Sequence, residues 1–138
     1  MKLQILKNIQ DCIDGYNPVL IDNGAFNVDL PDNSVESILM IETIDSIGAN
    51  QIDESLQKIR KLIRLNGSLK ISGIDLFCLS RDFLNGTIDT KTYNDIIFSR
   101  SGIYDSVTII NKLKALGLSV DQSLIKGSVY EIHAFRRG

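Results

Sequence analysis

Few residues in this sequence have the types and spacing that catalytic chemistry requires. The single His133 lies in the apolar stretch "VYEIHAF", which favours a strand, and no carboxylate or cysteine stands at a metal-ligand spacing from it. The sequence contains no GxSxG motif, no phosphate-binding P-loop and no histidine–carboxylate pair. We therefore expect no metal site and no acid–base or nucleophilic centre, and we interpret His133 as a histidine on one face of a strand.

An acidic loop is the clearest candidate for binding. The residues "DLPDNS" (29–34) directly precede the apolar run from Val35 to Ile41, which favours a buried strand. Aspartate, proline, asparagine and serine in such a loop can hold a ligand, but these residue types more often only turn the chain. Either use requires a strand on each side to position the loop.

The composition is that of one folded domain over residues 1–138. Hydrophobic residues make up 43% of the chain and charged residues 23%, which is ordinary for a globular domain. Nucleic-acid-binding domains usually carry a strong basic excess, whereas the formal net charge here is −2. We therefore expect no nucleic-acid partner, and we interpret the basic stretches 58–64 and 135–138 as solvated surface.

The cysteines and the hydropathy indicate the cellular compartment in which we expect the protein. Cys12 and Cys78 are the only cysteines, and no CxxC pair or signal peptide accompanies them. This favours free thiols in a reducing, cytoplasmic setting. No stretch approaches the roughly 18 consecutive apolar residues of a membrane helix, so we expect no membrane partner.

Hydrophobic periodicity predicts strands that alternate with helices, followed by a terminal hairpin. This order predicts an α/β fold whose sheet is mostly parallel and ends in an antiparallel pair. We expect strands at 2–6, 17–22, 36–41 and 68–75, helices at 8–15, 50–67, 75–84 and 104–117, an irregular polar segment at 85–104, and a hairpin of 118–125 with 128–136. The expected core consists of Ile38, Met40, Leu56, Ile59, Ile63, Leu69, Ile71, Ile110 and Leu113.

Two finer expectations concern the long helices. Asn66 and Gly67 are expected to end the helix at 50–67 in a left-handed conformation. The buried face of the helix at 104–117 is expected to consist of Val107, Ile110, Leu113 and Leu116.

The order of these segments resembles class I S-adenosylmethionine-dependent methyltransferases. "LPDNSVESILMIETIDSI" (30–47) is similar to the family's acidic loop and fourth strand, and "LQKIRKLIRLNGSLKISGID" (56–75) to the helix, turn and fifth strand that follow. "FSRSGIYDSVTIINKLKALGLSV" (98–120) and "VYEIHAFRR" (129–137) resemble the late helix and the last strands. The resemblance implies a truncated Rossmann-like sheet of the methyltransferase type over most of the chain.

The first loop departs from the family pattern. Glycines in that loop let the backbone approach the methionine part of the cofactor and turn sharply into a helix. The corresponding residues here are Leu6, Lys7 and Asn8, and no GxG occurs in the chain. A lysine there would crowd the ligand and place a positive charge near its sulfonium. We therefore expect a degenerate member that binds no cofactor.

A second departure lies between residues 22 and 30. The family places a helix and a further strand there, whereas residues 23–29 are fewer than the roughly ten or more that a parallel crossover requires. The resemblance implies that Asp22 would bind ribose hydroxyls and that Asp29 would accept from an adenine amino group of S-adenosylmethionine. Both remain open to the simpler interpretation as loop aspartates that fix turns. Asp75, where the family often has a polar active-site residue, is equally an N-cap for the helix at 75–84.

The resemblance and its departures imply two functions. In the first, this is a degenerate methyltransferase-like domain that does not catalyse and acts as a structural or interaction subunit. So compact a form resembles products of small viral or mobile genomes, which implies a part in viral assembly, in the cytoplasm or in a particle assembled there. In the second, it is an active S-adenosylmethionine-dependent methyltransferase that acts on a small molecule or saccharide.

The shortened sheet also predicts a partner. Loss of the helix and strand after Asp22 should end the sheet early and expose backbone groups and an apolar strip. We therefore expect a homo-oligomer or a fixed place in a protein assembly, with residues 17–30 at or near the contact.

Overall fold

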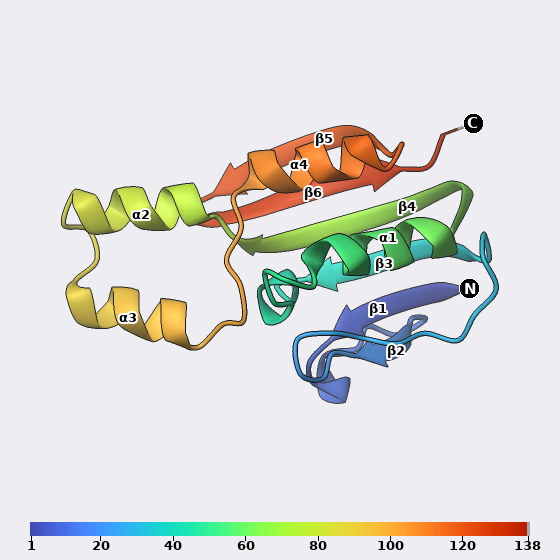
Figure 1. The fold of residues 1–138 in the computed structure, drawn as a ribbon, viewed down its shortest axis with the longest axis horizontal. Coiled ribbons are helices and arrows are strands. Elements are labelled where there is room, and N and C mark those ends of the chain that lie inside the picture. Colours follow the sequence, from blue (N-terminus) through green and yellow to red (C-terminus); the bar gives the residue numbers. More distant parts are fainter. Residues whose placement is uncertain (138) are drawn as a thin grey trace.

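Figure 1 shows the computed structural model of the protein, which describes residues 1–137. In this part of the chain the strands are β1 (Lys2–Leu6), β2 (Asn17–Leu20), β3 (Val35–Ile41), β4 (Ile63–Ile74), β5 (Ser119–Lys126) and β6 (Val129–Phe135). The α-helices are α1 (Ile52–Leu62), α2 (Leu76–Leu84), α3 (Thr90–Phe98) and α4 (Ser106–Ala115). Two short 3₁₀ turns, η1 (Ile9–Asp11) and η2 (Ile44–Ser46), complete the elements.

The strands form one sheet with the order β2-β1-β3-β4-β6-β5. The pairs β1–β2, β1–β3 and β3–β4 are parallel, while β4–β6 and β5–β6 are antiparallel. This confirms the predicted fold class: an α/β domain with a mostly parallel, Rossmann-like sheet and a C-terminal antiparallel hairpin.

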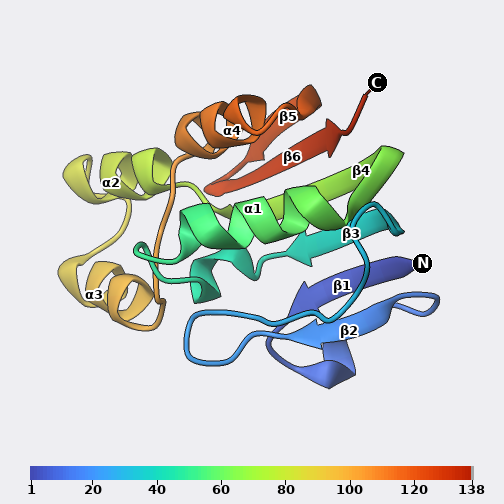
Figure 2. The same cartoon turned by 45° about the vertical axis from the view of Figure 1, so that its right-hand side comes forward.

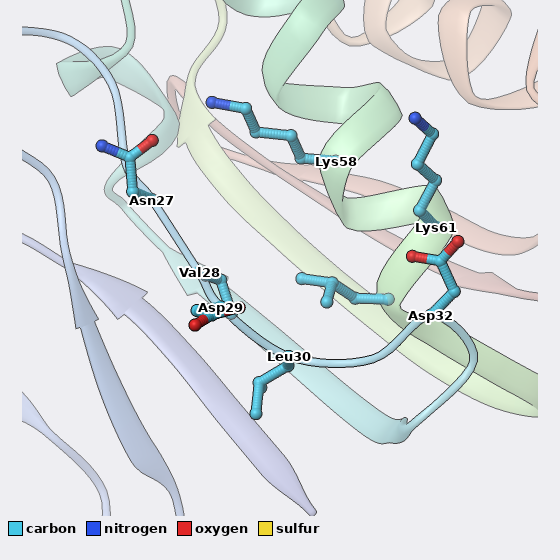
Figure 3. A pocket seen from close by; sticks show the side chains of 8 residues that line it. Asn27, Val28, Asp29, Leu30, Asp32, Lys58 and Lys61 are labelled. Atoms are coloured by element: carbon cyan, nitrogen blue, oxygen red, sulfur yellow. The ribbon is translucent and has the colours of Figure 1, made fainter.

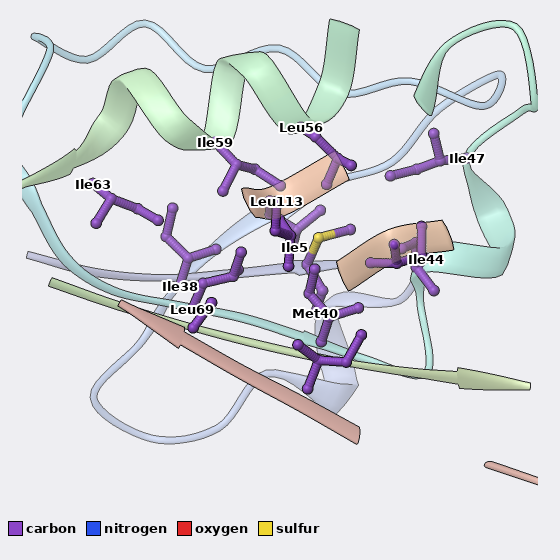
Figure 4. Close-up of a cluster of buried hydrophobic side chains, with 14 of the residues drawn as sticks. Ile5, Ile38, Met40, Ile44, Ile47, Leu56, Ile59, Ile63, Leu69 and Leu113 are labelled. Carbon is purple, nitrogen blue, oxygen red and sulfur yellow. The ribbon is translucent and has the colours of Figure 1, made fainter. Parts of the chain in front are cut away.

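Helices α1 and α4 cover one face of the sheet, which we call the helical face (Figures 1 and 2). A buried cross-strand row on this face runs from Leu3 through Ile38 and Leu69 to Ala134. Figure 4 shows how side chains of the helices close over these strands. All predicted core residues except Ile110 are buried: Ile38, Met40, Leu56, Ile59, Ile63, Leu69, Ile71 and Leu113.

The opposite face carries no α-helix among residues 1–137, and we call it the open face (Figure 2). Its central row runs from Gln4 through Leu39 and Lys70 to His133. Side chains of neighbouring strand residues point to opposite faces, so this row, which is polar except for Leu39, alternates with the apolar row of the helical face. The sheet is thus mostly parallel, and α-helices cover only one of its two faces within residues 1–137 (Figure 2).

The open face is polar at β4 and β6. Glu131 Oε1 lies 3.1 Å from Lys70 Nζ and 2.8 Å from His133 Nε2. His133 therefore has a carboxylate partner, and the expectation that it has none in sequence was wrong. Glu131 stands two residues before it, and residues two apart on a strand share a face.

The open face is more apolar at β1 and β2. Leu6 and Leu20 are register partners there, and Leu20 is exposed at the edge of the sheet. Ile9 and Ile13, in the segment after β1, are exposed as well. Exposed apolar side chains therefore occur in β2 and in the segment after β1, and the apolar strip expected there stays a prediction.

The helix predicted at 8–15 was wrong, because only the 3₁₀ turn η1 forms there. The buried Gln4 side chain intervenes. Its Oε1 accepts from the Ile13 backbone N–H at 2.7 Å, and its Nε2 donates to the Asp11 carbonyl at 3.3 Å. These bonds use backbone groups that a longer helix would pair internally.

The helix predicted at 50–67 is shorter, since α1 ends at Leu62 and β4 begins at Ile63. Asn66 is left-handed as predicted, with a φ of 64°. It lies, however, in an irregularity of β4, where the pairing with β3 moves from Ile63 to Ser68. The prediction of a left-handed Gly67 was wrong, because its φ is not positive; glycine fits there because a Cβ would come within 2.9 Å of the Arg64 carbonyl oxygen.

Aspartate N-caps begin α2, α3 and α4. Asp75, Asp89 and Asp105 each accept a hydrogen bond from a backbone N–H in the first turn of the helix that follows. The capping role predicted for Asp75 is confirmed, but the prediction that 85–104 is irregular was wrong, because α3 lies within it. Tyr93 of α3 stacks on Phe83 of α2 with ring centroids 4.4 Å apart, and the two helices extend beyond one end of the sheet (Figure 1).

The predicted buried face of α4 was wrong at Val107 but right at Leu113, and Ile110 and Leu116 are half-buried against the core. Ile109 and Leu113 are buried, whereas Val107 is exposed and Ile110 is only half-buried. The helix begins at Ser106, which is itself buried and donates from its hydroxyl to Asp75 Oδ2 at 3.4 Å. Ser106 and Ile109, three residues apart, therefore share the buried side of α4.

Strand β2 is one edge of the sheet. Residues 21–34, which connect it to β3, contain no helix or strand apart from the isolated bridge between Asp22 and Ala25. The predicted absence of a helix and strand between Asp22 and Leu30 is therefore confirmed. Cys12 and Cys78 are free, as predicted. No helix in residues 1–137 has the length and apolar character to cross a membrane.

Candidate functional site

The parallel strands β1, β3 and β4 end at the same edge of the sheet, beside the point where the strand order reverses. From β1 the order runs to β2 on one side and to β3 and β4 on the other. Ligands of open α/β sheets bind in the crevice outside the carboxyl ends of the strands at such a point. Here a crevice of about 480 Å³ opens between the residues that follow β1 and those that follow β3.

The β1 wall of the crevice consists of Leu6, Lys7 and Asn8, the residues that stand in place of a glycine loop. Asn8 is extended, with a φ of −119°. All three carry side chains, so the backbone cannot come as close to the crevice as a glycine turn would allow. The positive charge of Lys7 belongs to this wall.

The chain's own segment after β1 borders the same crevice. Asp11 and Ile13 line it, and the two hydrogen bonds between their backbone groups and the Gln4 side chain hold them there. Since η1 spans only Ile9–Asp11, no long helix presents its N-terminus to the crevice. The phosphate-binding arrangement that helix N-termini provide is therefore missing here.

The β3 wall consists of Ile41, Glu42 and Thr43. Glu42 is left-handed with a φ of 53°, and its N–H is held by the Ser72 carbonyl at 3.0 Å and the Ser72 hydroxyl at 2.9 Å. A non-glycine residue in this conformation costs about 1–3 kcal/mol, so the surrounding bonds must hold it. Thr43 Oγ1 donates to the Ile5 carbonyl at 2.9 Å and ties the two walls together.

A second cavity of about 360 Å³ shares Lys7 and Glu42 with the crevice. Asp45 and Arg100 also line it, and Arg100 Nε lies 3.5 Å from Asp45 Oδ2. The Ile74 N–H donates to the same oxygen at 3.2 Å. Asp45 is only 5% exposed. Its burial raises the pKa of this carboxyl, against the lowering by the Ile74 N–H and Arg100.

Asp45 Oδ1 and the Tyr130 hydroxyl are both buried and have no hydrogen-bond partner within residues 1–137. Both face Gly73, where a Cβ would lie 3.1 Å from Asp45 Oδ1 and 3.2 Å from Tyr130 Oη. Burial, and next the charge of Asp45, raise the pKa of Tyr130. Only glycine fits at position 73 without displacing one of these groups.

Asp22 begins a tight turn at the end of β2. Its N–H donates to the Ala25 carbonyl at 2.8 Å, and its carbonyl accepts from the Ala25 N–H at 3.1 Å. Asn23 and Gly24 between them have φ values of 51° and 79°, as in a type I′ turn. This geometry favours the turn interpretation, and ribose binding by Asp22 stays a prediction.

Asp29 lines a different cavity, a groove of about 400 Å³ between the 27–32 loop and α1 (Figure 3). In Figure 3 Lys58 and Lys61 project from α1 along this groove, and Asp32 lies across from Lys61. Lys58 Nζ is already engaged, since it donates to the Phe26 carbonyl at 3.2 Å. The groove shares no lining residue with the crevice, so the structure does not bring Asp29 to Lys7 or Glu42. Adenine binding by Asp29 stays a prediction.

The sequence reasoning missed Glu42, Thr43, Asp45 and Arg100. The first three stand in "ETID", directly after the strand predicted at 36–41. The carboxyl end of a parallel strand is itself a signal for a site, and it would have found them. Arg100 gave no such signal, because it follows a helix that was not predicted.

Charges of both signs meet in the two cavities. Lys7 and Arg100 are positive, and Glu42 and Asp45 are negative. Such a set can bind a zwitterionic ligand, or it can satisfy itself through ion pairs. Asp11 adds a third carboxylate in the crevice, and the Arg100–Asp45 pair engages two of these five groups.

The fold is similar to that of solved S-adenosylmethionine-dependent methyltransferases. The match to one from Methanosarcina mazei has a TM-score of 0.64 and 11% identity, over 99% of this chain and 82% of that chain. A Thermotoga maritima protein described as a possible histamine N-methyltransferase matches with a TM-score of 0.61 and 16% identity, over 89% of this chain and 65% of that chain. A Haloferax volcanii protein in complex with the Trm112 methyltransferase activator matches with a TM-score of 0.61 and 10% identity, over 94% of this chain and 64% of that chain.

These similarities show the fold alone: the chain has a class I methyltransferase-like fold, as its sequence predicted. It spans 56% of the length of an Aquifex aeolicus methyltransferase and 65% of the Thermotoga maritima protein, less than two thirds of either. No family model and no curated protein sequence matches it.

Proposed function

We propose that this protein is a methyltransferase-like domain that does not transfer methyl groups and acts as a structural or interaction subunit. The observation that carries the proposal is the wall of the switch-point crevice. Leu6, Lys7 and Asn8 stand there in place of glycines, and the chain's own segment, fixed by Gln4, borders the rest. The backbone approach that the cofactor needs is therefore blocked from two sides.

Electrostatics support the same function. The sulfonium of S-adenosylmethionine is a cation, and the Lys7 ammonium lines both cavities in which it would sit. Two like charges 4 Å apart repel by about 1 kcal/mol in water and by about 4 kcal/mol near a protein surface. Lys7 thus disfavours the ligand by charge as well as by shape.

The shortened connection at 21–34 also supports it. No helix or strand in that segment encloses the adenosine side of the crevice. Asp22 begins a turn, and Asp29 lines a groove under α1, so neither carboxylate lines the crevice. The groups that the resemblance assigns to ribose and adenine are dispersed.

A second candidate is an active methyltransferase that acts on a small molecule or saccharide. Glu42 favours it, because the chain maintains a left-handed glutamate at the switch point, where its carboxylate could attract a sulfonium. The crevice volume of about 480 Å³ also falls within the range of small-molecule sites. This candidate requires Glu42 to outweigh Lys7.

Calorimetry with S-adenosylmethionine and S-adenosylhomocysteine separates the two candidates. We expect no heat of binding at millimolar ligand for the natural chain. The double variant Lys7→Gly with Asn8→Gly should also fail to bind tightly, because the 21–34 segment stays short. Micromolar binding by the natural chain, abolished in Glu42→Gln, would overturn the proposal and establish the second candidate.

We place the partner contact of this subunit at the β2 edge, in residues 17–30, in a homo-oligomer or a larger assembly such as a viral particle formed in the cytoplasm. Exposed Leu20, Ile9 and Ile13 support this surface, and Pro18 blunts the edge only in part. The Haloferax volcanii neighbour, solved with an activator protein, supports partner binding by this fold.

Light scattering combined with amide hydrogen exchange tests the contact. We expect a mass above that of the monomer and slow exchange in residues 17–30. Leu20→Glu should restore the monomer, while Leu65→Glu, an equally exposed leucine elsewhere, should not. A natural chain that is monomeric at high micromolar concentration, with residues 17–30 exchanging freely, would contradict the homo-oligomer.

A further inference from the structure

An apolar groove of about 380 Å³ lies at the β5 end of the sheet, the edge opposite β2. It opens between the start of α2, the start of α4 and the end of β5. Phe77 on α2 is 72% exposed, Val107 on α4 is 63% exposed and Ile125 on β5 is 47% exposed. Apolar side chains from three separate elements thus meet at one exposed place.

Strand β5 offers unpaired backbone groups beside this groove. It is the last strand of the sheet and pairs with β6 alone. Beyond the irregularity at Val120 and Gln122, its pairing with β6 is regular as far as Lys126. The outward N–H and C=O groups of residues 122–126 therefore form a continuous edge to which another strand can pair.

The groove lies on the side of the sheet that an added strand would reach. Ile125 is the register partner of Tyr130, a buried residue of the helical face. Since cross-strand partners share a face, Ile125 points to the helical face, next to Val107. A strand paired with β5 would place every second side chain on this face, and one of them would enter the groove.

The charges around the groove are acidic. Asp75 and Asp105 are the charged residues among those that line it within the described chain. Of the nearby bases, Arg81 lies 3.1 Å from its neighbouring carboxylate of Asp82, and Lys126 ends β5 outside the residues that line the groove. A second copy of this chain would bring one Asp105 toward the other, whereas a basic segment would meet complementary charge.

We propose that the groove and the outer edge of β5 together bind an extended basic segment of a partner protein. The segment pairs with residues 122–126 as an added strand, inserts one apolar side chain between Phe77, Val107 and Ile125, and places a lysine or arginine next to Asp105. Backbone pairing supplies affinity and the groove supplies specificity, as in other cases of strand addition. This inference goes beyond the non-catalytic role, because it holds whether or not the crevice binds a cofactor.

Selection from a random heptapeptide library displayed on phage tests the proposal on the full chain. We expect the enriched peptides to carry an apolar residue flanked by lysine or arginine. Their affinity should fall at least about tenfold for Val107→Glu and for the milder Val107→Ser. Leu84→Glu is the matched control, because Leu84 is 83% exposed on α2 and does not line the groove. The enriched peptides should bind this variant with the affinity that they have for the natural chain.

Two further measurements separate the parts of the proposal. Asp105→Asn keeps a good N-cap but removes the charge, so it should weaken the preference for basic peptides and leave the apolar preference intact. Hydrogen exchange of the complex should slow at residues 122–126. Four outcomes would each overturn the inference. The selection could enrich no peptide, or it could enrich acidic peptides. The peptides could bind both Val107 variants as well as the natural chain, or the chain could form a homodimer that Val107→Glu dissociates. The calorimetry of the crevice is independent of all four outcomes.

Discussion

The helical face and the open face of the sheet are made by the same strands with opposite chemistry. On the helical face, the row from Leu3 to Ala134 is buried beneath α1 and α4. On the open face, one residue away on each strand, the row from Gln4 to His133 includes a lysine and a histidine that bond the same glutamate. β4 shows the difference within one stretch, because Leu69 and Ile71 are buried while Lys70 remains half-exposed between them.

This difference explains how the sheet stands with helices on one face only. Parallel strands covered on both faces read as continuous apolar runs, because both faces are buried. Here the β4 sequence "SLKIS" alternates with period two, as in a sheet with one solvated face. The stability of the domain should therefore rest on the helical face, and the open face should tolerate substitution at its half-exposed positions on β4 and β6.

The largest effect should come from truncating the core of the helical face. Ile59→Ala or Leu113→Ala should lower the free energy of unfolding by about 2–5 kcal/mol, because each side chain is fully buried. Urea unfolding measures the loss. Leu39→Ala, which truncates a half-buried aliphatic of the open face, is the control and should cost less. Losses below about 1 kcal/mol at both core positions would mean that stability does not rest on this face.

Adding one methyl group to the helical face should have the next largest effect. In Gly73→Ala the new Cβ would lie 2.7 Å from Ile44 Cγ2 and close to Asp45 and Tyr130, so we expect a loss of about 1–3 kcal/mol. Thermal unfolding measures it. Gly48→Ala is the control, because its closest contact is the flexible end of Gln51. Equal costs at the two glycines would contradict the crowding at position 73.

Asp45 should give the helical face a pH dependence of known sign. Burial raises the pKa of this carboxyl in the folded state above its ordinary 3.8. The stability of the natural chain relative to Asp45→Asn should therefore be greatest below about pH 3.8, and it should fall as the pH rises through the raised pKa. Unfolding of both chains across this window measures the difference. A difference that grows with pH would mean that the Arg100 pair outweighs burial.

The smallest effect should come from the open face. Glu131→Gln should lower the free energy of unfolding by less than about 1 kcal/mol. Glu131, Lys70 and His133 are partly exposed, so water solvates their charges almost as well as the ion pairs do. The pKa of Glu131 is lowered by the His133 hydrogen bond and then by Lys70, so the contribution should be present above the ordinary carboxyl pKa and lost as the pH falls through the lowered value. Unfolding at low and high salt measures it, since salt should weaken the effect. A loss as large as that of Ile59→Ala would remove the distinction between the faces.

The order of the strands and most of the core could be predicted from the sequence, because apolar runs mark strands wherever burial is strong. The errors arose where single side chains decided local structure. Gln4 bonds the backbone at Asp11 and Ile13 and replaces a helix by one turn. On α4, Ser106 is buried and bonds Asp75 while Val107 is exposed, and no periodicity reports a contact with so distant a residue.

The candidate site was less predictable than the fold. The absence of glycine at Lys7 could be read directly, but Glu42 became a site residue only through its left-handed backbone, which depends on bonds to Ser72 across the sheet. Arg100 joins the site through the return of the chain from α3. Such groups come together through tertiary contacts that a one-dimensional pattern does not contain.

The length of the irregular connection at 21–34 affects the entropy that the chain loses when it folds and closes this loop. It closes the gap between β2 and β3 without helical or strand pairing of its own. Closing a flexible loop of twice the length would cost only about 0.6 kcal/mol more, since the entropic term grows with the logarithm of length. An insertion elsewhere in this connection would therefore cost little loop entropy, whereas the turn at Asn23 and Gly24 is held by the bonds between Asp22 and Ala25 and by the bond from Gly48 to the Gly24 carbonyl.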